Sequence, residues 1–340
     1  MINRIYRLKE AGRIEADFAS ISLNDSQVIV RPKYLSICAA DQRYFRGERN
    51  PEAMKKKLPM ALIHEGMGTV LWDPTGMFAP GEQVVMIPNV AGSGAEYIKE
   101  NYRRESHFLS SGYDGFMQDY VALSPEQLIR LPENAGIHYV LTELLSVACN
   151  AISTWNKLGR TRDGDRFGVW GSGSMGYITA LALRILYPKA HITMVSRSRE
   201  KLSYCSFADR LLQTSDNIPE NEFDCCFECV GGSASQMAIE QMITAVRPQG
   251  TLVLLGVNEE PVPMRTRMIL EKGLAVLGAS RSDRTDFEMA VDMIRRKKRM
   301  ENYLKVIISE VVVIKNLKDI DEAFNIDNNM PFKTVMEWKI

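Results

Sequence analysis

The chain has 340 residues, equal numbers of acidic and basic side chains, and 45% hydrophobic residues. This length exceeds one ordinary core and predicts two domains. The densest basic run, residues 295–299, contains no aromatic residue, so we do not expect nucleic acid as a partner. No stretch approaches about 20 uncharged apolar residues, and residues 1–10 lack an apolar leader core. We therefore expect a cytoplasmic protein with no membrane partner.

Residues 1–150 have the pattern of a β-rich unit. Short apolar alternations at 27–31, 68–71, 83–87 and 117–123 are separated by Pro, Gly and Asn turns. Residues 89–112 interrupt this pattern with small and charged residues, which predicts a surface excursion with little to bury.

Cys38 and the pair His64-Glu65 are candidate ligands of a catalytic zinc, which takes about three N, O or S ligands and keeps one position open. Such a pair is often solvated and a lone Cys is often a core residue, so the rest of the chain has to support the site. Glu143 is a fourth candidate, because a carboxylate in an apolar helical stretch is costly unless it is partnered.

From residue 137 the apolar period changes toward 3.6, which predicts a helix that carries Glu143 and ends near residue 158. A strand at 165–170 then leads into a glycine-rich turn, a helix, and a second strand at 191–196. In this setting the pattern G-x-G-x-x-G is the fingerprint of a dinucleotide site. The predicted cofactor-binding residues of this turn are Gly171, Ser172, Gly173, Ser174, Met175 and Gly176.

The end of the second strand indicates which nicotinamide cofactor binds. An acidic residue there would bond the ribose hydroxyls of NAD. The chain has Ser196, Arg197 and Arg199 instead, whose hydroxyl and guanidinium groups suit a 2′-phosphate. NADPH is therefore the predicted cofactor, although these residues also fit an ordinary exposed helix start.

The following segments predict a six-stranded doubly wound sheet. Further strands are expected at 211–212, 224–230, 250–256 and 274–278, with a helix at 235–246. The connection 213–222 is too short and polar for a full crossover helix. After residue 278, a helix at 286–297 and strands at 306–308 and 334–338 are expected to return to the first domain. The predicted segments are 1–150, 151–278 and 279–340.

Cys38, His64-Glu65 and Glu143 upstream of the glycine motif resemble the zinc-dependent medium-chain alcohol and polyol dehydrogenases over the whole chain. Within that superfamily the chain is most similar to the bacterial ribulose-5-phosphate reductases, in the segments 36–44, 58–60, 115–119, 227–232 and 270–274. The resemblance implies an α/β protein in which a Rossmann domain is inserted into a GroES-like catalytic domain. It also implies reduction of ribulose 5-phosphate to ribitol 5-phosphate with NADPH, for CDP-ribitol and teichoic acid or capsule synthesis.

The resemblance further implies one catalytic zinc per chain, because the excursion lacks the four cysteines that hold a structural zinc in many relatives. Two departures stand out. Ala40 replaces the hydroxyl residue that often relays the proton, so Glu65, Glu143, Tyr44 or a water must take part. Ile63 replaces the commoner glycine before the ligand histidine. In the expected mechanism Cys38, His64 and Glu65 bind the zinc, and Glu143 is an exchangeable ligand or holds a water.

The substrate phosphate requires cationic partners, and the candidates are Arg43, Arg46, Arg49, Lys272 and Arg281. Each also fits a solvated surface residue. The resemblance implies a homodimer, in which the strand 251–255 and the following residues 256–258 are expected to pair across a two-fold axis. It also implies a cytidylyltransferase partner. Three other functions stay open: a dehydrogenase of unphosphorylated polyols, a zinc-free quinone or enone reductase, and a non-catalytic NADPH-binding scaffold.

Overall fold

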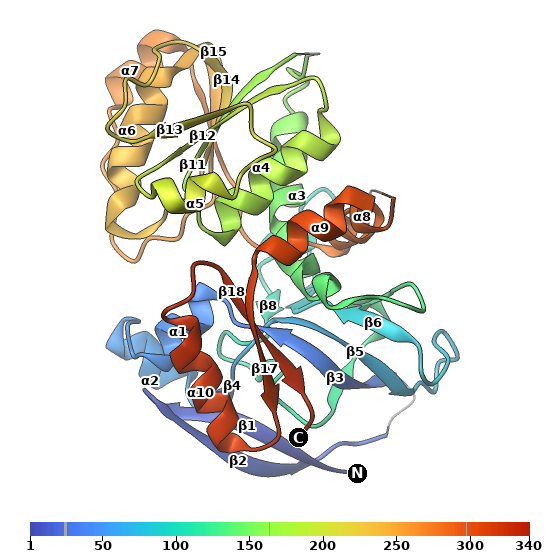
Figure 1. Ribbon diagram of the computed structural model, residues 1–340. Helices are drawn as coiled ribbons and strands as arrows, with labels where there is room; N and C mark the ends of the chain where they lie inside the picture. The colour runs from blue at the N-terminus through green and yellow to red at the C-terminus, as the bar shows by residue number, and fades with distance from the viewer. Residues whose placement is uncertain (24–25, 163, 297) are drawn as a thin grey trace. The chain divides into compact units, whose positions relative to one another are not determined.

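The computed structural model describes residues 1–23, 26–162, 164–296 and 298–340 (Figure 1). The chain forms two compact units. Unit 1 comprises Met1–Ser146 and Ser282–Ile340, and unit 2 comprises Val147–Arg281. The chain first passes from unit 1 to unit 2 within helix α3 (Thr142–Asn156). No helix among the described residues is long and apolar enough to cross a membrane.

Unit 2 is built on a six-stranded parallel sheet in the order β13-β12-β11-β14-β15-β16. In Figure 1, α4 and α5 lie on one side of this sheet and α6 and α7 on the other. This arrangement confirms the predicted doubly wound sheet. The elements are β11 (Arg166–Trp170), α4 (Ser174–Leu186), β12 (His191–Ser196), α5 (Arg199–Ser203), β13 (Arg210–Gln213), β14 (Phe223–Glu228), α6 (Ser235–Ala245), β15 (Val246–Leu254), α7 (Thr266–Lys272) and β16 (Ala275–Gly278).

The first turn of this sheet depends on two glycines. Gly171 has φ +105°, which a residue with a side chain rarely adopts. A Cβ on Gly176 would lie 1.9 Å from the carbonyl oxygen of Gly171, so only glycine lets α4 approach β11 this closely. As the sequence predicts, β13 and β14 are joined without a helix.

Unit 1 contains a seven-stranded sheet with the path β10-β6-β5-β3-β18-β17, and β9 also pairs with β3. The strands are β3 (Val28–Ser36), β5 (Glu65–Trp72), β6 (Gln83–Met86), β9 (Val121–Leu123), β10 (Leu128–Arg130), β17 (Ile308–Ile314) and β18 (Lys333–Trp338). A second sheet has the order β2-β1-β4, from β1 (Ile2–Glu10), β2 (Arg13–Ser20) and β4 (Met60–Ala61). The return of the last segment to the first sheet is thus as predicted.

Unit 1 also contains helices. They are α1 (Ala39–Phe45), α2 (Pro51–Lys57), the first part of α3, α8 (Arg284–Arg296), α9 (Lys298–Val306) and α10 (Leu317–Asp327), with short 3-10 turns at Glu100–Tyr102, Pro125–Gln127 and Ile137–Leu141. Among them, α10 packs against β17 and β18. Phe324 of α10 stacks on Phe45 of α1 with ring centroids 4.5 Å apart, which joins α10 to the core of unit 1.

Three predicted boundaries differ from the structure. The helix expected from residue 137 is a 3-10 turn (Ile137–Leu141) followed by α3, so Glu143 lies in the first turn of the α-helix. Val306 ends α9, and the strand begins only at Ile308. The predicted helix 286–297 corresponds to α8, and its last predicted residue, Lys297, lies outside the described residues.

The excursion 89–112 contains the small hairpin β7 (Asn89–Val90) and β8 (His107–Phe108). Contrary to the expectation of little burial, Phe108 and Ser110 are buried. Ser110, which follows the hairpin, donates a hydrogen bond to Asp41 in the first turn of α1, and this contact keeps it buried.

Candidate functional site

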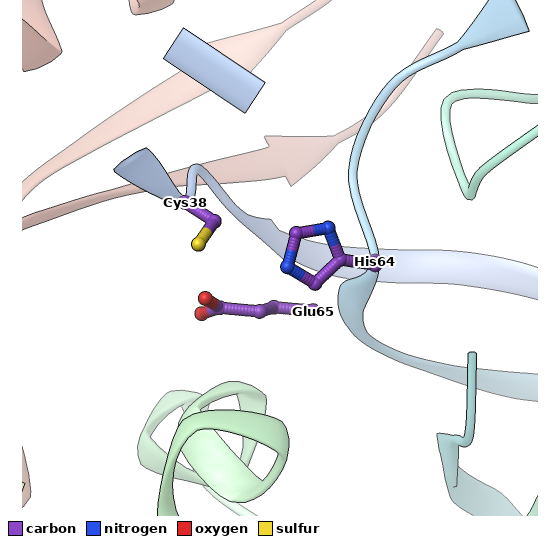
Figure 2. Close-up of side chains that lie close together, drawn as sticks. All are labelled: Cys38, His64 and Glu65. Carbon is purple, nitrogen blue, oxygen red and sulfur yellow. The ribbon is translucent and has the colours of Figure 1, made fainter. Parts of the chain in front are cut away.

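Sheet pairing explains how Cys38 meets the pair His64-Glu65. The end of β3 pairs with the beginning of β5, and Ser36 lies opposite Glu65. Cys38 follows two residues later as the N-cap of α1, and His64 directly precedes β5. The ligand atoms of Cys38, His64 and Glu65 all lie within 4.8 Å of one another. In Figure 2 the sulfur, one ring nitrogen and the carboxylate of these residues turn toward a common space.

These three side chains fit a zinc ion. Thiolate, imidazole and carboxylate are the ligand types of zinc, and three of them leave a fourth position for water or substrate. Glu65 is fully buried, and its Oε2 has no hydrogen-bond partner among the described residues. A buried carboxylate oxygen without a donor is costly. A cation bound between the three groups would supply its missing partner.

Asp41 lies beside His64. Its Oδ1 lies 3.5 Å from Nδ1 of His64, and it accepts hydrogen bonds from Ser110 Oγ at 2.7 Å and the amide of Ile63 at 3.0 Å. Burial lowers the pKa of His64, but the charge of Asp41 and the sulfur of Cys38 outweigh it and raise that pKa well above its usual value. A carboxylate behind a ligand histidine fixes the ring and leaves the other nitrogen for the metal.

The backbone before His64 is strained. Ile63 has φ +70°, a conformation that glycine adopts easily and a β-branched residue rarely does. Its amide is held by Asp41, and its carbonyl accepts from the amide of Phe116 at 2.7 Å. The bonds on both sides of Ile63 thus keep it in the conformation that directs His64 toward Cys38.

Lys333 is a site residue that the sequence analysis did not identify. It begins β18, is 5% exposed, and forms an ion pair with Oε1 of Glu65. Its Nζ also donates to the carbonyl of Ile37 at 3.1 Å. Burial lowers the pKa of Lys333, but Glu65 and Cys38 raise it more, so the ammonium stays charged. The cluster therefore contains a fixed protein cation beside the proposed metal position.

Glu143 is buried but does not belong to the group of three ligands. Burial raises its pKa to about 7, opposed by the positive charge of His64 and reinforced by Glu65. A carboxyl group with this pKa exchanges a proton near neutral pH. The structure thus places Glu143 within electrostatic range of the cluster, as a group that can hold a proton.

Tyr44 and Arg49 lie together in unit 1. Tyr44 is on α1 and is 3% exposed, and its hydroxyl accepts a hydrogen bond from Lys57 Nζ at 3.0 Å. The guanidinium of Arg49 lies 4.8 Å from the centroid of the Tyr44 ring. Arg43 is half-buried on the same helix, whereas Arg46 is exposed and pairs with Glu48.

The other two cationic candidates belong to unit 2. The Nζ of Lys272 donates to three carbonyl oxygens at the end of α6, those of residues 243, 244 and 246, at 2.8 to 2.9 Å. All its donors are thereby used within the fold, and its assignment to the substrate phosphate stays a prediction. Arg281 has φ +58°, and its carbonyl accepts from Asn150 at 2.9 Å.

Unit 2 has a cavity of about 330 Å³ at the carboxyl end of its sheet. Of the predicted cofactor residues, it is lined by Gly171, Ser172, Gly173, Ser196 and Arg197. Ser174, Met175 and Gly176 form the first turn of α4 and do not line it. Arg199 does not line it either, whereas Lys201, which the sequence analysis missed, does.

A hollow of about 480 Å³ lies along α10 in unit 1, but none of the predicted site residues lines it. It is lined by Lys318, Asp321, Glu322, Asn325, Ile326 and Asn329. Predicted site residues thus lie at the Cys38 cluster and at the cavity of unit 2.

Comparison with known proteins shows the family of the chain. Residues 24–133 match the family described as alcohol dehydrogenase GroES-like domain, and residues 176–296 match zinc-binding dehydrogenase. The chain is 45% identical over 343 aligned positions to the ribulose-5-phosphate reductase of Bacillus spizizenii, with 100% of both chains covered. It is 41% identical to ribulose-5-phosphate reductase 2 of Staphylococcus aureus, also with full coverage of both chains.

Among solved structures, S. aureus TarJ in complex with NADPH superposes with a TM-score of 0.89 at 39% identity, again covering 100% of both chains. L-idonate 5-dehydrogenase of Escherichia coli has a TM-score of 0.86 at 20% identity, with 99% of this chain and 98% of that chain covered, which shows a shared fold. These comparisons confirm the predicted GroES-like and Rossmann fold class and the predicted membership. The chain belongs to the zinc-binding, GroES-like alcohol dehydrogenase family, in the branch of the ribulose-5-phosphate reductases.

Proposed function

We propose that the protein reduces the C2 carbonyl of D-ribulose 5-phosphate to D-ribitol 5-phosphate with NADPH. The observation that carries the proposal is the buried cluster of Cys38, His64 and Glu65, in a chain 45% identical over its full length to a reductase of this substrate. The product would supply CDP-ribitol for teichoic acid or capsule synthesis.

Cys38, His64 and Glu65 would hold the zinc, with Asp41 orienting His64 and Lys333 orienting Glu65. When bound, zinc acts as a Lewis acid on the substrate carbonyl. Burial of Glu143 raises its pKa, and its carboxyl group would hold a proton for the product oxygen, directly or through a water. Glu143 would thus take the place of the proton-relaying hydroxyl, which Ala40 does not have. Whether Glu143 also enters the coordination sphere stays a prediction.

NADPH would occupy the cavity of unit 2. The pyrophosphate fits the turn of Gly171, Ser172 and Gly173, because a helix N-terminus and exposed backbone amides favour an anion. Arg197 and Lys201 line the same cavity and would pair with the 2′-phosphate. The cofactor-binding roles of Ser174, Met175, Gly176 and Arg199, which do not line this cavity, stay predictions.

The assembly is also a proposal. The strand 251–255, which the sequence analysis placed at a two-fold axis, cannot extend the sheet, because β15 pairs with β14 on one side and β16 on the other. The edge strand beside β15 is β16, and Val276 on it is 38% exposed. We propose a homodimer through this edge. A cytidylyltransferase partner remains a prediction.

The segments 1–150 and 279–340 are proposed as the catalytic domain, and 151–278 as the NADPH-binding domain. The described structure contains only free cysteines, which suits a reducing compartment such as the cytoplasm.

The test is NADPH oxidation with D-ribulose 5-phosphate and with D-ribulose, on zinc-loaded and chelator-treated protein. We expect a strong preference for the phosphorylated sugar, and loss of turnover with the metal. Equal turnover of both sugars would support a general polyol dehydrogenase instead. Turnover that survives metal removal would contradict the zinc site, and no turnover with any sugar would favour a scaffold.

A further inference from the structure

We propose that Lys57, together with the hydroxyls of Tyr44 and Ser111, binds the phosphate group of the substrate. This inference rests on the proposed function, because it requires a phosphorylated sugar. It assigns phosphate binding to a lysine on α2 that is not among the candidates from the sequence analysis.

The hydrogen bonds of Lys57 fix its ammonium group and leave one donor for an anion. It is half-buried at the end of α2, and its Nζ donates to Tyr44 Oη and to Ser111 Oγ, each at 3.0 Å. Both partners are neutral hydroxyls. Lys57 Nζ also lies 5.7 Å from the centroid of the Tyr44 ring. An ammonium has three donor hydrogens, so a third donor direction is left for a ligand.

A second cation lies against the same ring. The Arg49 guanidinium is 4.8 Å from the centroid of Tyr44, and Lys57 Nζ is 5.7 Å from it. Two cations thus border one buried ring. A phosphate beside Lys57 would accept a charge-assisted hydrogen bond from its ammonium and hydrogen bonds from the two hydroxyls.

The position of this cluster suits a pentulose phosphate. Asp41 and Tyr44 are three residues apart on α1 and therefore lie on the same face of the helix, with their Cβ atoms about 5–6 Å apart. Asp41 faces His64, and Tyr44 faces Lys57. The excursion 89–112 connects the same two groups, because Ser110 donates a hydrogen bond to Asp41 and its neighbour Ser111 accepts one from Lys57. A substrate whose carbonyl lies at the zinc cluster would thus have a phosphate site one helical turn away.

The test compares three variants with the wild-type enzyme in its zinc-loaded form. Lys57→Met removes the cation, Lys57→Arg retains it, and Lys56→Met is a matched control on an exposed neighbour in the same helix. KM and kcat are measured for D-ribulose 5-phosphate and for D-ribulose. Inorganic phosphate is used as a competitive inhibitor, and circular dichroism checks that each variant is folded.

For Lys57→Met we expect KM for the phosphorylated sugar to rise by about 10-fold or more, because one charge-assisted hydrogen bond to the phosphate is lost. KM for ribulose should not change, and inhibition by phosphate should weaken. Lys57→Arg should retain most of the affinity, and Lys56→Met should match the wild type. If the wild type prefers the phosphorylated sugar and Lys57→Met keeps that preference, this proposal is wrong while the proposed function stands. If the wild type does not discriminate between the sugars, both fail.

Tyr44→Phe gives a second, independent measurement. It removes the hydroxyl and leaves the ring on which Arg49 and Lys57 lie. A rise in KM limited to the phosphorylated sugar supports the phosphate site. A fall in kcat for both sugars with unchanged KM would instead assign Tyr44 to proton transfer and would overturn its place in this site.

Discussion

Lys333 and Glu65 form a buried ion pair, and Glu65 is also one of the three residues proposed to bind zinc. The two carboxylate oxygens are therefore divided between two cations. Oε1 accepts from Lys333, while Oε2 has no partner among the described residues. Lys333 orients Glu65 when no metal is bound, and it lowers the net negative charge that the metal would meet.

Replacing Lys333 by Met should destabilise the zinc-free protein by about 3–5 kcal/mol, because the charge of Glu65 is left buried without a partner. The loss should be smaller in the zinc-loaded protein, where the metal compensates Glu65. Urea unfolding with and without zinc measures both values. The double variant Lys333→Met with Glu65→Gln is the control, and in the zinc-free protein it should recover much of the lost stability. Equal destabilisation with and without zinc would contradict the shared role of Glu65.

Ser110 should affect zinc affinity although it is not a ligand. Its hydroxyl donates to Oδ1 of Asp41, the same atom that lies near His64. Partners that orient a metal-binding histidine affect metal affinity by about 10–100-fold, and we expect Ser110→Ala to lie at the low end of this range because Asp41 keeps its bonds to backbone amides. Competition with a chromophoric chelator measures the affinity. Ser111→Ala, which removes the neighbouring hydroxyl that bonds Lys57, should leave zinc affinity unchanged; an equal loss in both variants would indicate a general effect of the loop.

The sequence predicted the ligand types of the metal site but not the groups that support them. Cys38 and His64-Glu65 are recognisable because few other residues bind zinc in this pattern. Lys333 is 268 positions from Glu65, and nothing around it indicates burial until β18 is paired with β3. Ser110 lies in a polar segment that was expected to be exposed, and its contact with Asp41 keeps it buried.

The position at which α5 begins determines which basic residues near it line the cavity of unit 2. Both arginines of the run 196–199 were predicted to bind the phosphate. Arg197 precedes the N-cap Ser198, and Lys201 lies inside α5. Both line the cavity, whereas Arg199, the first residue of α5, does not. The start of the helix could not be placed accurately enough from the sequence to separate these alternatives.

Glu143 should make the stability of the zinc-free protein fall as the pH rises. Its pKa is raised from 4.5 in the unfolded chain to about 7 in the fold. Between these values the folded state binds more protons than the unfolded state, so the free energy of unfolding decreases with increasing pH. The full effect is of the order of 3 kcal/mol between pH 4 and pH 8.

Glu143→Gln removes this titration, and the variant should be more stable than the wild type at pH 8 but not at pH 4. Urea unfolding of both zinc-free proteins at the two pH values measures the difference. A difference between wild type and variant that does not change with pH would show that Glu143 does not titrate in this range.

Arg197 and Lys201 should determine the preference for NADPH over NADH. Both line the cavity of unit 2 beyond Ser196, and each charge-assisted bond to a phosphate contributes about 1.5–3 kcal/mol. Arg197→Ala and Lys201→Ala should therefore each raise KM for NADPH by about 10-fold or more, with little change in KM for NADH. Arg199→Ala is the matched control, since it removes the same charge two positions from Arg197 without altering the cavity lining. If Arg199→Ala weakens NADPH as much as Arg197→Ala, a general positive potential at the start of α5 is responsible, and the specific contacts assigned to Arg197 and Lys201 are wrong.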